Sequence, residues 1–229
     1  MFYSQRNKKV AIIVDGSFFR KRYFKHYKKS YSDVDPKVFA KAIHTHSLKH
    51  ILKDKGEELY RIYYYDCHPF DEKAHYPNSQ GKRIYKSNET ETFKFQTKLY
   101  EELVDLPSFA LRYGYLDSKN AYWDIVKEKK QDVLRGKIRI EDLQDQDFIY
   151  TTKQKGVDIK IGIDIASLSI KRLVEKIVLI TGDSDFIPAI KLARTEGVQV
   201  VLDPMGNHIT PDMRENIDFL STKLLNFKK

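Results

Sequence analysis

The sequence has little cysteine and no long hydrophobic run. Cys67 is the only cysteine, so the chain cannot form an internal disulfide and has no group of thiols for a metal site. No apolar stretch approaches the roughly 20 residues that cross a bilayer, and the first ten residues lack the apolar core of a signal peptide. We therefore expect a cytoplasmic protein with no membrane partner, in which Cys67 is a small buried side chain.

The composition favours a folded, basic protein. Of its 229 residues, 41% are hydrophobic and 13% aromatic, and the formal net charge is +9. This length suits one large core, so we expect a single domain over residues 1–229. The positive balance favours a polyanion, with nucleic acid first, as the partner. Excess lysine can also serve solubility alone, and charge by itself does not separate these two interpretations.

Short apolar runs alternate with helical patterns along the chain. The runs predicted as strands cover residues 9–15, 59–66, 108–117, 176–183 and 198–203. Helical patterns cover residues 35–53, 90–106, 157–173 and 185–197, with Asp35 as the N-cap of the first and Gly197 closing the last. Strand followed by helix, repeated, predicts an α/β fold with a mainly parallel central sheet and helices on both faces.

Residues 118–154 interrupt this alternation because they are rich in charge and poor in apolar periodicity. We interpret them as an insertion or lid, within which residues 134–142 form a small hairpin or an edge strand. The histidines at 44, 46 and 50 lie in the first predicted helix, and we expect them on its solvated face rather than around a metal.

Each of the five predicted strands ends in an aspartate. Because the carboxyl ends of parallel strands share one edge of a sheet, these side chains are expected along a single rim. The runs that end at Asp15 and Asp183 are the most apolar and are expected at the centre. Asp117 and Asp203 suit ordinary turns, while Asp66 fits either role.

Carboxylates gathered within a few ångströms repel one another unless they are protonated or bind cations. Oxygen ligands without histidine or cysteine suit Mg²⁺ or Mn²⁺, which predicts a metal site for phosphate chemistry. The alternative, a glycosidase acid and base, lacks any feature that would raise the pKa of one acid selectively.

The helix predicted from residue 157 supplies a further acid. Its apolar stripe places Asp158 in the first turn, at the end that faces the rim. Asp164, six residues later, lies about 120° around the axis and about 9 Å along it, so both acids cannot easily contact one ion. This geometry favours Asp158 as the ligand.

Four motifs in this order resemble the NYN domain, in the LabA-like branch of the PIN-like nuclease superfamily. They are "VDGSFF" after the first strand, "YYYD" after the second, "QKGVDIKIGIDIASL" and "ITGDSDFIPAI", and the resemblance runs from residue 9 to about 202. It implies a three-layer α/β/α PIN-like fold with sheet order 3-2-1-4-5, and an acidic pocket that binds Mg²⁺ or Mn²⁺ and cleaves RNA.

The resemblance also assigns roles to residues. It implies Asp15, Asp158, Asp183 and Asp185 as metal ligands, with Asp164 matching a further family acid and Asp66 as an additional candidate. The first motif commonly carries Asn where this chain has Phe18, so Ser17 is the candidate substitute. A second ion or Lys155 is expected to offset charge on the leaving oxygen.

The stretch 18–29 interleaves bases with aromatic rings, a composition that suits phosphates and unpaired bases. The competing interpretation is a helix with an ordinary core stripe at Phe18, Phe19, Tyr23 and Tyr27. We expect single-stranded RNA as the favoured partner, with DNA and a homodimer left open. The residues predicted to contact nucleic acid are Ser17, Arg20, Lys21, Arg22, Lys25, Lys155 and Ser184.

Two functions remain after this reading. The first is a metal-dependent ribonuclease, which the acidic rim favours. The second is a catalytically inactive RNA-binding or adaptor module that keeps the fold, since a fold does not guarantee its chemistry.

Overall fold

The centre of the fold is a set of parallel strands that are apolar because both of their faces are covered. In the computed structural model, which describes residues 7–78 and 82–223, β1 (Lys8–Asp15) pairs with β2 (Glu57–Cys67) and with β9 (Lys176–Ile180). β5 (Phe109–Leu116) continues beyond β2, and β10 (Gln199–Asp203) beyond β9. The order β5-β2-β1-β9-β10 is 3-2-1-4-5 when these five strands are counted along the chain.

Two short strands extend this order at its edges. β8 (Gln154–Lys155) pairs antiparallel with the end of β5, and β11 (Phe219–Leu220) pairs parallel with β10. The sheet is therefore mainly parallel, as predicted, and longer by one strand at each edge.

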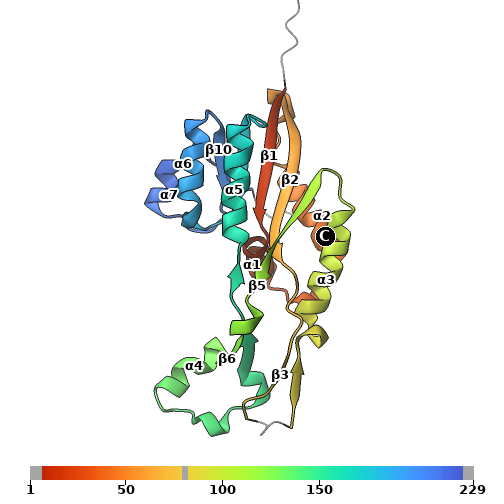
Figure 1. Cartoon of the computed structure of the whole chain (residues 1–229), viewed down its shortest axis with the longest axis vertical. Helices are drawn as coiled ribbons and strands as arrows, with labels where there is room; N and C mark the ends of the chain where they lie inside the picture. Colours follow the sequence, from red (N-terminus) through yellow and green to blue (C-terminus); the bar gives the residue numbers. More distant parts are fainter. Residues whose placement is uncertain (1–6, 79–81, 224–229) are drawn as a thin grey trace, which may run out of the picture.

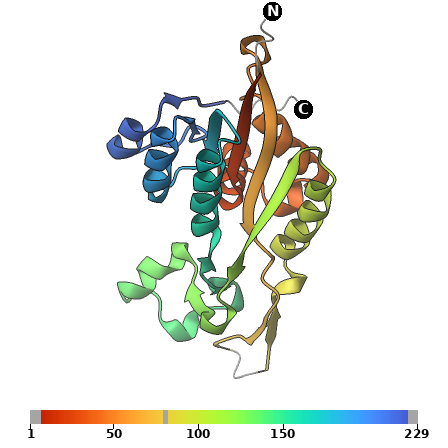
Figure 2. The same ribbon diagram turned by 45° about the horizontal axis from the view of Figure 1, so that its top comes forward.

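Helices cover both faces of the sheet, which confirms the three-layer α/β/α fold (Figures 1 and 2). One face carries α1 (Gly16–Tyr27), α2 (Pro36–Leu48) and α3 (Glu91–Val104). The other carries α5 (Val157–Ile170), α6 (Ile187–Thr195) and α7 (Pro211–Asn216). None of the described helices is long and apolar enough to cross a membrane.

The alternation of side chains along β1 supplies both hydrophobic cores. Val10, Ile12 and Val14 pack under α1, α2 and α3, while Ala11 and Ile13 face the helices on the other side. All five are fully buried, which explains why this strand reads as a continuous apolar run rather than an alternating one.

Local signals at the helix ends act as the sequence indicates. The Asp35 carboxylate accepts a hydrogen bond from the Lys37 backbone N–H at 2.7 Å, and Pro36 occupies the first turn of α2. Gly197 follows α6 with φ of 82°, a left-handed conformation that glycine adopts without strain.

The segment predicted as an insertion folds into a hairpin with a helix between its strands. β6 (Tyr122–Ile125) pairs with β7 (Phe148–Thr151), and α4 (Lys127–Leu134) lies between them in sequence. The prediction of a hairpin or edge strand at residues 134–142 is wrong, because this stretch holds the end of α4 and a short 3₁₀ turn.

A second excursion, which the sequence did not reveal, packs against the first. β3 (Lys73–His75) and β4 (Ile84–Lys86) form a hairpin between β2 and α3, and the rings of Tyr76 and Tyr85 lie 4.9 and 5.5 Å from that of Trp123. We call the described parts of residues 68–90 and 117–153 the distal lobe. Figure 1 shows it beyond the carboxyl ends of β1, β2 and β5.

Core packing on the α3 face predicts a large stability effect. Leu99 of α3 is fully buried, whereas Leu134 of α4 is 72% exposed. Leu99→Ala should lower the free energy of unfolding by about 2–5 kcal/mol through lost burial and a cavity. Leu134→Ala should change it by less than about 1 kcal/mol. Urea denaturation of both variants measures the difference, and equal effects would contradict the packing described.

Candidate metal centre

Asp15 ends β1 and begins α1, so its carboxylate is fixed from two sides. One oxygen, Oδ1, accepts the backbone N–H of Phe18 at 3.0 Å, as an N-cap, and the hydroxyl of Ser17 at 3.2 Å. The other, Oδ2, accepts the hydroxyl of Thr181 at 3.3 Å. Thr181 lies just after β9, so this contact joins the ends of the two central strands.

The acids that follow β9 are placed by a tight turn. Asp183 Oδ1 accepts the backbone N–H of Asp185 at 2.9 Å and so caps the 3₁₀ turn Ser184–Phe186. The backbone N–H of Asp183 donates to the Thr181 hydroxyl at 3.2 Å. Asp183 therefore also serves as the N-cap of this turn, whereas Asp185 is exposed.

Asp158 lies in the first turn of α5, directly after β8 and the left-handed Gly156, whose φ is 80°. Partial burial raises the pKa of the Asp158 carboxyl, and the negative charges of Asp183, Asp15 and Asp185 raise it further. The other three carboxylates, from different parts of the chain, therefore lie close enough to Asp158 to act on its charge. We call Asp15, Asp158, Asp183 and Asp185 the acidic site.

The acidic site lacks internal compensation. Among the described residues, none of these four carboxylates forms an ion pair with lysine, arginine or histidine. The N-terminal end of α5 offers only a partial positive charge to Asp158. Clustered carboxylates with hydrogen-bond donors on one side and no cation on the other fit a hard divalent ion.

The carboxylates of the acidic site are not the most tightly grouped ligands in this chain. Within the described ranges, the side chains whose ligand atoms lie within 4.8 Å of one another are His46, His50 and Asp203.

Asp66 does not belong to the acidic site, and the structure contradicts its prediction as a metal ligand. Its buried carboxylate forms a two-point ion pair with the guanidinium of Arg20. The backbone N–H of Cys67 and the side-chain amide of Gln154 also donate to it, at 2.9 and 3.3 Å. Arg20 is itself buried, so its predicted contact with nucleic acid is also wrong.

Asp164 is likewise engaged elsewhere. Its Oδ2 accepts the hydroxyl of Tyr65 at 2.6 Å and the Nε–H of Arg112 at 3.1 Å. It holds α5 against β2 and β5. The geometric preference for Asp158 over Asp164 at the helix start therefore agrees with the arrangement observed.

The remaining predicted site residues divide between structure and surface. Lys155 is paired with Asp117 at 2.5 Å, which raises the pKa of Lys155, so its charge is already offset by a carboxylate outside the acidic site. Arg22 donates from Nη2 to the Met205 carbonyl at 2.9 Å and so holds the loop after β10. The predicted residues that are exposed or half-buried are Ser17 and Lys21 in the first half of α1, Lys25 in its last turn, and Ser184 after β9.

Phe18 occupies the position where the related motif commonly has an asparagine, and it packs on the end of β9. A Cβ at Gly182 would lie 2.6 Å from the Phe18 ring and 3.1 Å from Nδ2 of Asn207. Gly182 is therefore required for close approach between these segments. Of the predicted stripe on α1, Phe19 and Tyr23 are buried, which favours the core interpretation for this face.

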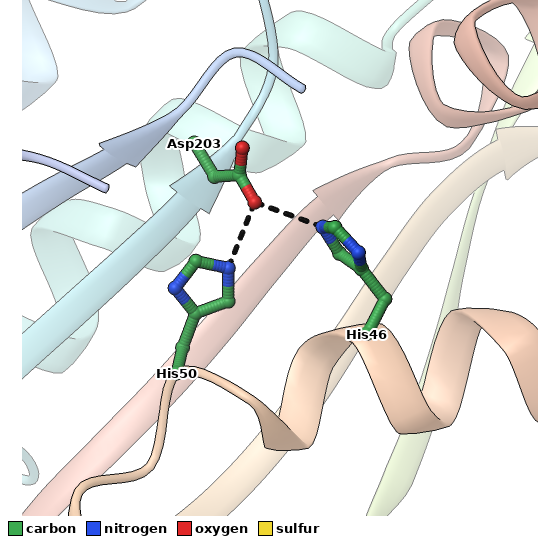
Figure 3. Close-up of side chains that lie close together, drawn as sticks. All are labelled: His46, His50 and Asp203. Carbon is green, nitrogen blue, oxygen red and sulfur yellow. Dashed lines mark hydrogen bonds and ion pairs between the residues drawn. The ribbon is translucent and has the colours of Figure 1, made fainter. Parts of the chain in front are cut away.

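Two histidines that were expected on a solvated surface lie buried beside Asp203, at the end of β10. Figure 3 shows Nε2 of His46 and Nε2 of His50 directed at Oδ2 of Asp203, at 2.8 and 2.9 Å. All three side chains are buried, so the prediction of a solvated face is wrong for both histidines. His46 continues the buried stripe of Phe39 and Ile43 at helical spacing, and that periodicity was the available signal.

The charge on Asp203 is stabilised by these two imidazoles. Burial by itself would raise its pKa, but hydrogen bonds from His46 and His50 hold the pKa of Asp203 at about 2. Burial lowers the pKa of His50 despite the neighbouring carboxylate. Asp203 is therefore a buried anion between two rings. It also shapes the turn after β10, as predicted, because its Oδ1 accepts the backbone N–H of Met205.

Comparison with known proteins places this arrangement in a family. The model of the NYN domain matches residues 91–216, more than half of the chain. The chain belongs to the NYN domain family. Asp158, Asp183 and Asp185 lie inside the matched range, while Asp15 lies outside it and is joined to the others by the pairing of β1 with β9.

The comparisons with individual proteins add the fold alone. No curated protein matches this chain. The crystal structure of a protein of unknown function from Vibrio parahaemolyticus aligns over 96% of each chain with a TM-score of 0.50 and 14% sequence identity. At that identity the likeness extends to the path of the backbone and not to the chemistry of the NYN domain.

The buried pair of Arg20 and Asp66 predicts a stability role. Asp66→Asn should lower the free energy of unfolding by about 3–5 kcal/mol, because Arg20 is left buried without its counter-charge. Asp117→Asn, which weakens the partly exposed pair with Lys155, should have a much smaller effect, because solvent screens this pair. Denaturant titration measures both. A small effect of Asp66→Asn would show that this carboxylate has another role.

Repulsion within the acidic site predicts a titration coupling. With Asp183→Asn, the pKa of Asp158 should fall toward its ordinary value, because one of the negative charges that raise it is removed. Carboxyl-carbon NMR against pH in metal-free buffer measures this pKa. Asp54→Asn, at an exposed turn before β2, is the control and should leave it unchanged. An unaltered pKa in Asp183→Asn would rule out the coupling.

Proposed function

We propose that this NYN domain, of the LabA-like branch, is a divalent-metal-dependent ribonuclease that hydrolyses RNA phosphodiester bonds. The observation that carries the proposal is the convergence of Asp15, Asp158, Asp183 and Asp185 without a paired cation among the described residues. Acids that serve only structure in this chain, such as Asp66 and Asp203, have cationic or imidazole partners instead.

The donor set fits Mg²⁺ or Mn²⁺. Asp15, Asp158 and Asp183 would hold the ion, with Asp185 beside them, since hard oxygen ligands without sulfur or nitrogen suit these cations. When bound, the ion supplies activation of water and stabilisation of charge on the phosphate.

The residues around the acidic site prepare it for that role. Ser17, the Phe18 backbone N–H and Thr181 fix the orientation of Asp15 before any ligand arrives. The Asp185 backbone N–H does the same for Asp183. Carboxylates held in place by donors on the protein side need little reorganisation when a cation and a phosphate bind.

Substrate contacts are proposed on the surface next to the acidic site. Lys21 and Lys25 are exposed on α1, which begins at Asp15, and they can neutralise phosphates. The distal lobe leaves the sheet from the ends of β2 and β5, the same edge as the acidic site (Figure 1). A single strand of RNA could therefore contact both surfaces at once, and the net charge of +9 favours its approach.

The proposal is tested with labelled single-stranded RNA and DNA in Mg²⁺, in Mn²⁺ and in chelator. The wild type should cleave RNA only with a divalent ion, and Asp15→Asn or Asp183→Asn should slow cleavage by about 10²-fold or more, as expected when charge stabilisation at the reacting phosphate is lost. Asp54→Asn, which removes the same charge far from the acidic site, should cleave as the wild type does.

Two outcomes would contradict the ribonuclease proposal. The first is full activity in Asp15→Asn with a correctly folded protein. The second is salt-sensitive RNA binding by the wild type without turnover in either ion, which is the behaviour of an inactive RNA-binding or adaptor module.

A further inference from the structure

His46, His50 and Asp203 bring three metal-binding side chains together outside the acidic site. His46 lies in the last turn of α2, His50 follows that helix, and Asp203 ends β10. Their ligand atoms lie within 4.8 Å of one another. Figure 3 shows the two rings approaching Asp203 from the side of α2.

We propose that these three residues form a binding site for one divalent transition-metal ion of the Zn²⁺ type, which braces α2 against β10. The donor set decides the class of ion. Two imidazole nitrogens with one carboxylate oxygen suit Zn²⁺ and its first-row neighbours, whereas Mg²⁺ and Ca²⁺ prefer oxygen ligands alone. The site therefore differs from the acidic site in the ion that it selects.

The distances between the donors are close to those that coordination requires. Both Nε2 atoms lie 2.8–2.9 Å from the same carboxylate oxygen. Around a tetrahedral ion with bonds of about 2.0–2.1 Å, neighbouring ligand atoms are about 3.3 Å apart. A shift of about half an ångström in side chains that already point at one another is enough. In that change each Nε2 gives up its proton to bind the ion and each ring carries its one proton on Nδ1, so both imidazoles bind as neutral ligands.

Burial and local charge also favour an ion of this kind. The three side chains are almost wholly excluded from solvent, so a carboxylate and two imidazoles are grouped where little bulk water competes with them for an ion. Asp203 is further held by the backbone N–H of Met205, which donates to Oδ1 at 2.8 Å. This hydrogen bond to Oδ1 orients the carboxylate so that Oδ2 faces the two rings. Hydrogen bonds from neighbouring groups commonly orient metal ligands in this way.

A route to the site exists from the surface. His50 lines a cavity of about 400 Å³ together with Glu57, Lys176 and Lys223. The ammonium of Lys176 is paired with Glu57 at 2.9 Å, so its charge is offset within the cavity wall. A water molecule from this side can complete a fourth position beside the three protein ligands.

The connections of Asp203 indicate what the ion would do. Met205, two residues later, accepts hydrogen bonds from Arg22 of α1, and Asn207 of the same loop lies near Gly182 beside the acidic site. An ion at His46, His50 and Asp203 would fix α2, β10 and this loop in one arrangement. Its role is structural, because the cavity that His50 lines includes no residue of the acidic site.

The test uses the untagged full chain after removal of metal by chelator. Titration with Co²⁺ as a spectroscopic probe, in excess Mg²⁺ that occupies the acidic site, should give visible absorption that saturates at one ion per chain and is displaced by Zn²⁺. Proton NMR of the Co²⁺ form should show two shifted, solvent-exchangeable imidazole N–H signals, one from each histidine. Zn²⁺ should also raise the Tm, since a ligand that binds only the folded state stabilises it.

Matched variants separate this site from the acidic site. His50→Gln and Asp203→Asn should weaken Co²⁺ and Zn²⁺ binding by about 100-fold or more, beyond the 10–100-fold typical of outer contacts. Asp158→Asn should leave the absorption, the stoichiometry and the Tm shift unchanged. Circular dichroism of each variant verifies the fold.

Three results would overturn the proposal. They are the absence of stoichiometric Co²⁺ binding by the wild type, binding lost in Asp158→Asn but kept in His50→Gln, or a Co²⁺ form without shifted imidazole signals. The first and third require no variant, so they decide the question even if His50→Gln fails to fold. The outcome is independent of RNA cleavage.

Discussion

Repulsion between carboxylates at the carboxyl edge of a parallel sheet is the constraint on which the rest of this molecule depends. β1 and β9 are adjacent and parallel, and their apolar residues are buried, so the residues that leave them emerge side by side. β1 ends at Asp15, Asp183 follows β9 by three residues, and α5 adds Asp158 to the same edge. The fold thus holds negative charges together that would separate in a free chain, and the free energy for this comes from the two apolar cores on either side of the sheet.

The side chains that contact each aspartate distinguish the aspartates that stabilise the fold from those of the acidic site. Asp66 and Asp203 are buried and satisfied by Arg20 or by the two histidines, and they connect helices to the sheet. The acids of the acidic site receive hydrogen bonds only from hydroxyl and backbone N–H groups in the described contacts. A single sheet edge therefore carries two kinds of aspartate, and what distinguishes them is the side chain that approaches from another element.

Much of the fold could be predicted from the sequence because it depends on local patterns. The two most apolar runs, which end at Asp15 and Asp183, indicated the two central strands of the sheet. Asp35 and Gly197 marked helix ends by their own backbone preferences. The partners of Asp66 and Asp203 could not be predicted in this way, since Arg20 and His46 reach them across more than forty residues of chain. The basic composition of residues 18–29 suggested a surface, yet Arg20 lies on the inward face of α1. The hairpin of β3 and β4 was missed because its two short strands carry little apolar periodicity.

The close approach at Gly114 links the distal lobe to the catalytic edge proposed for this domain. A Cβ there would lie 2.6 Å from the Lys155 carbonyl oxygen and 2.7 Å from the Val157 side chain, so only glycine lets β5 approach the start of α5 this closely. Only Gly156 separates β8 from the helix that presents Asp158. The strand from which the distal lobe leaves the sheet is thus in direct contact with the segment that positions one carboxylate of the acidic site.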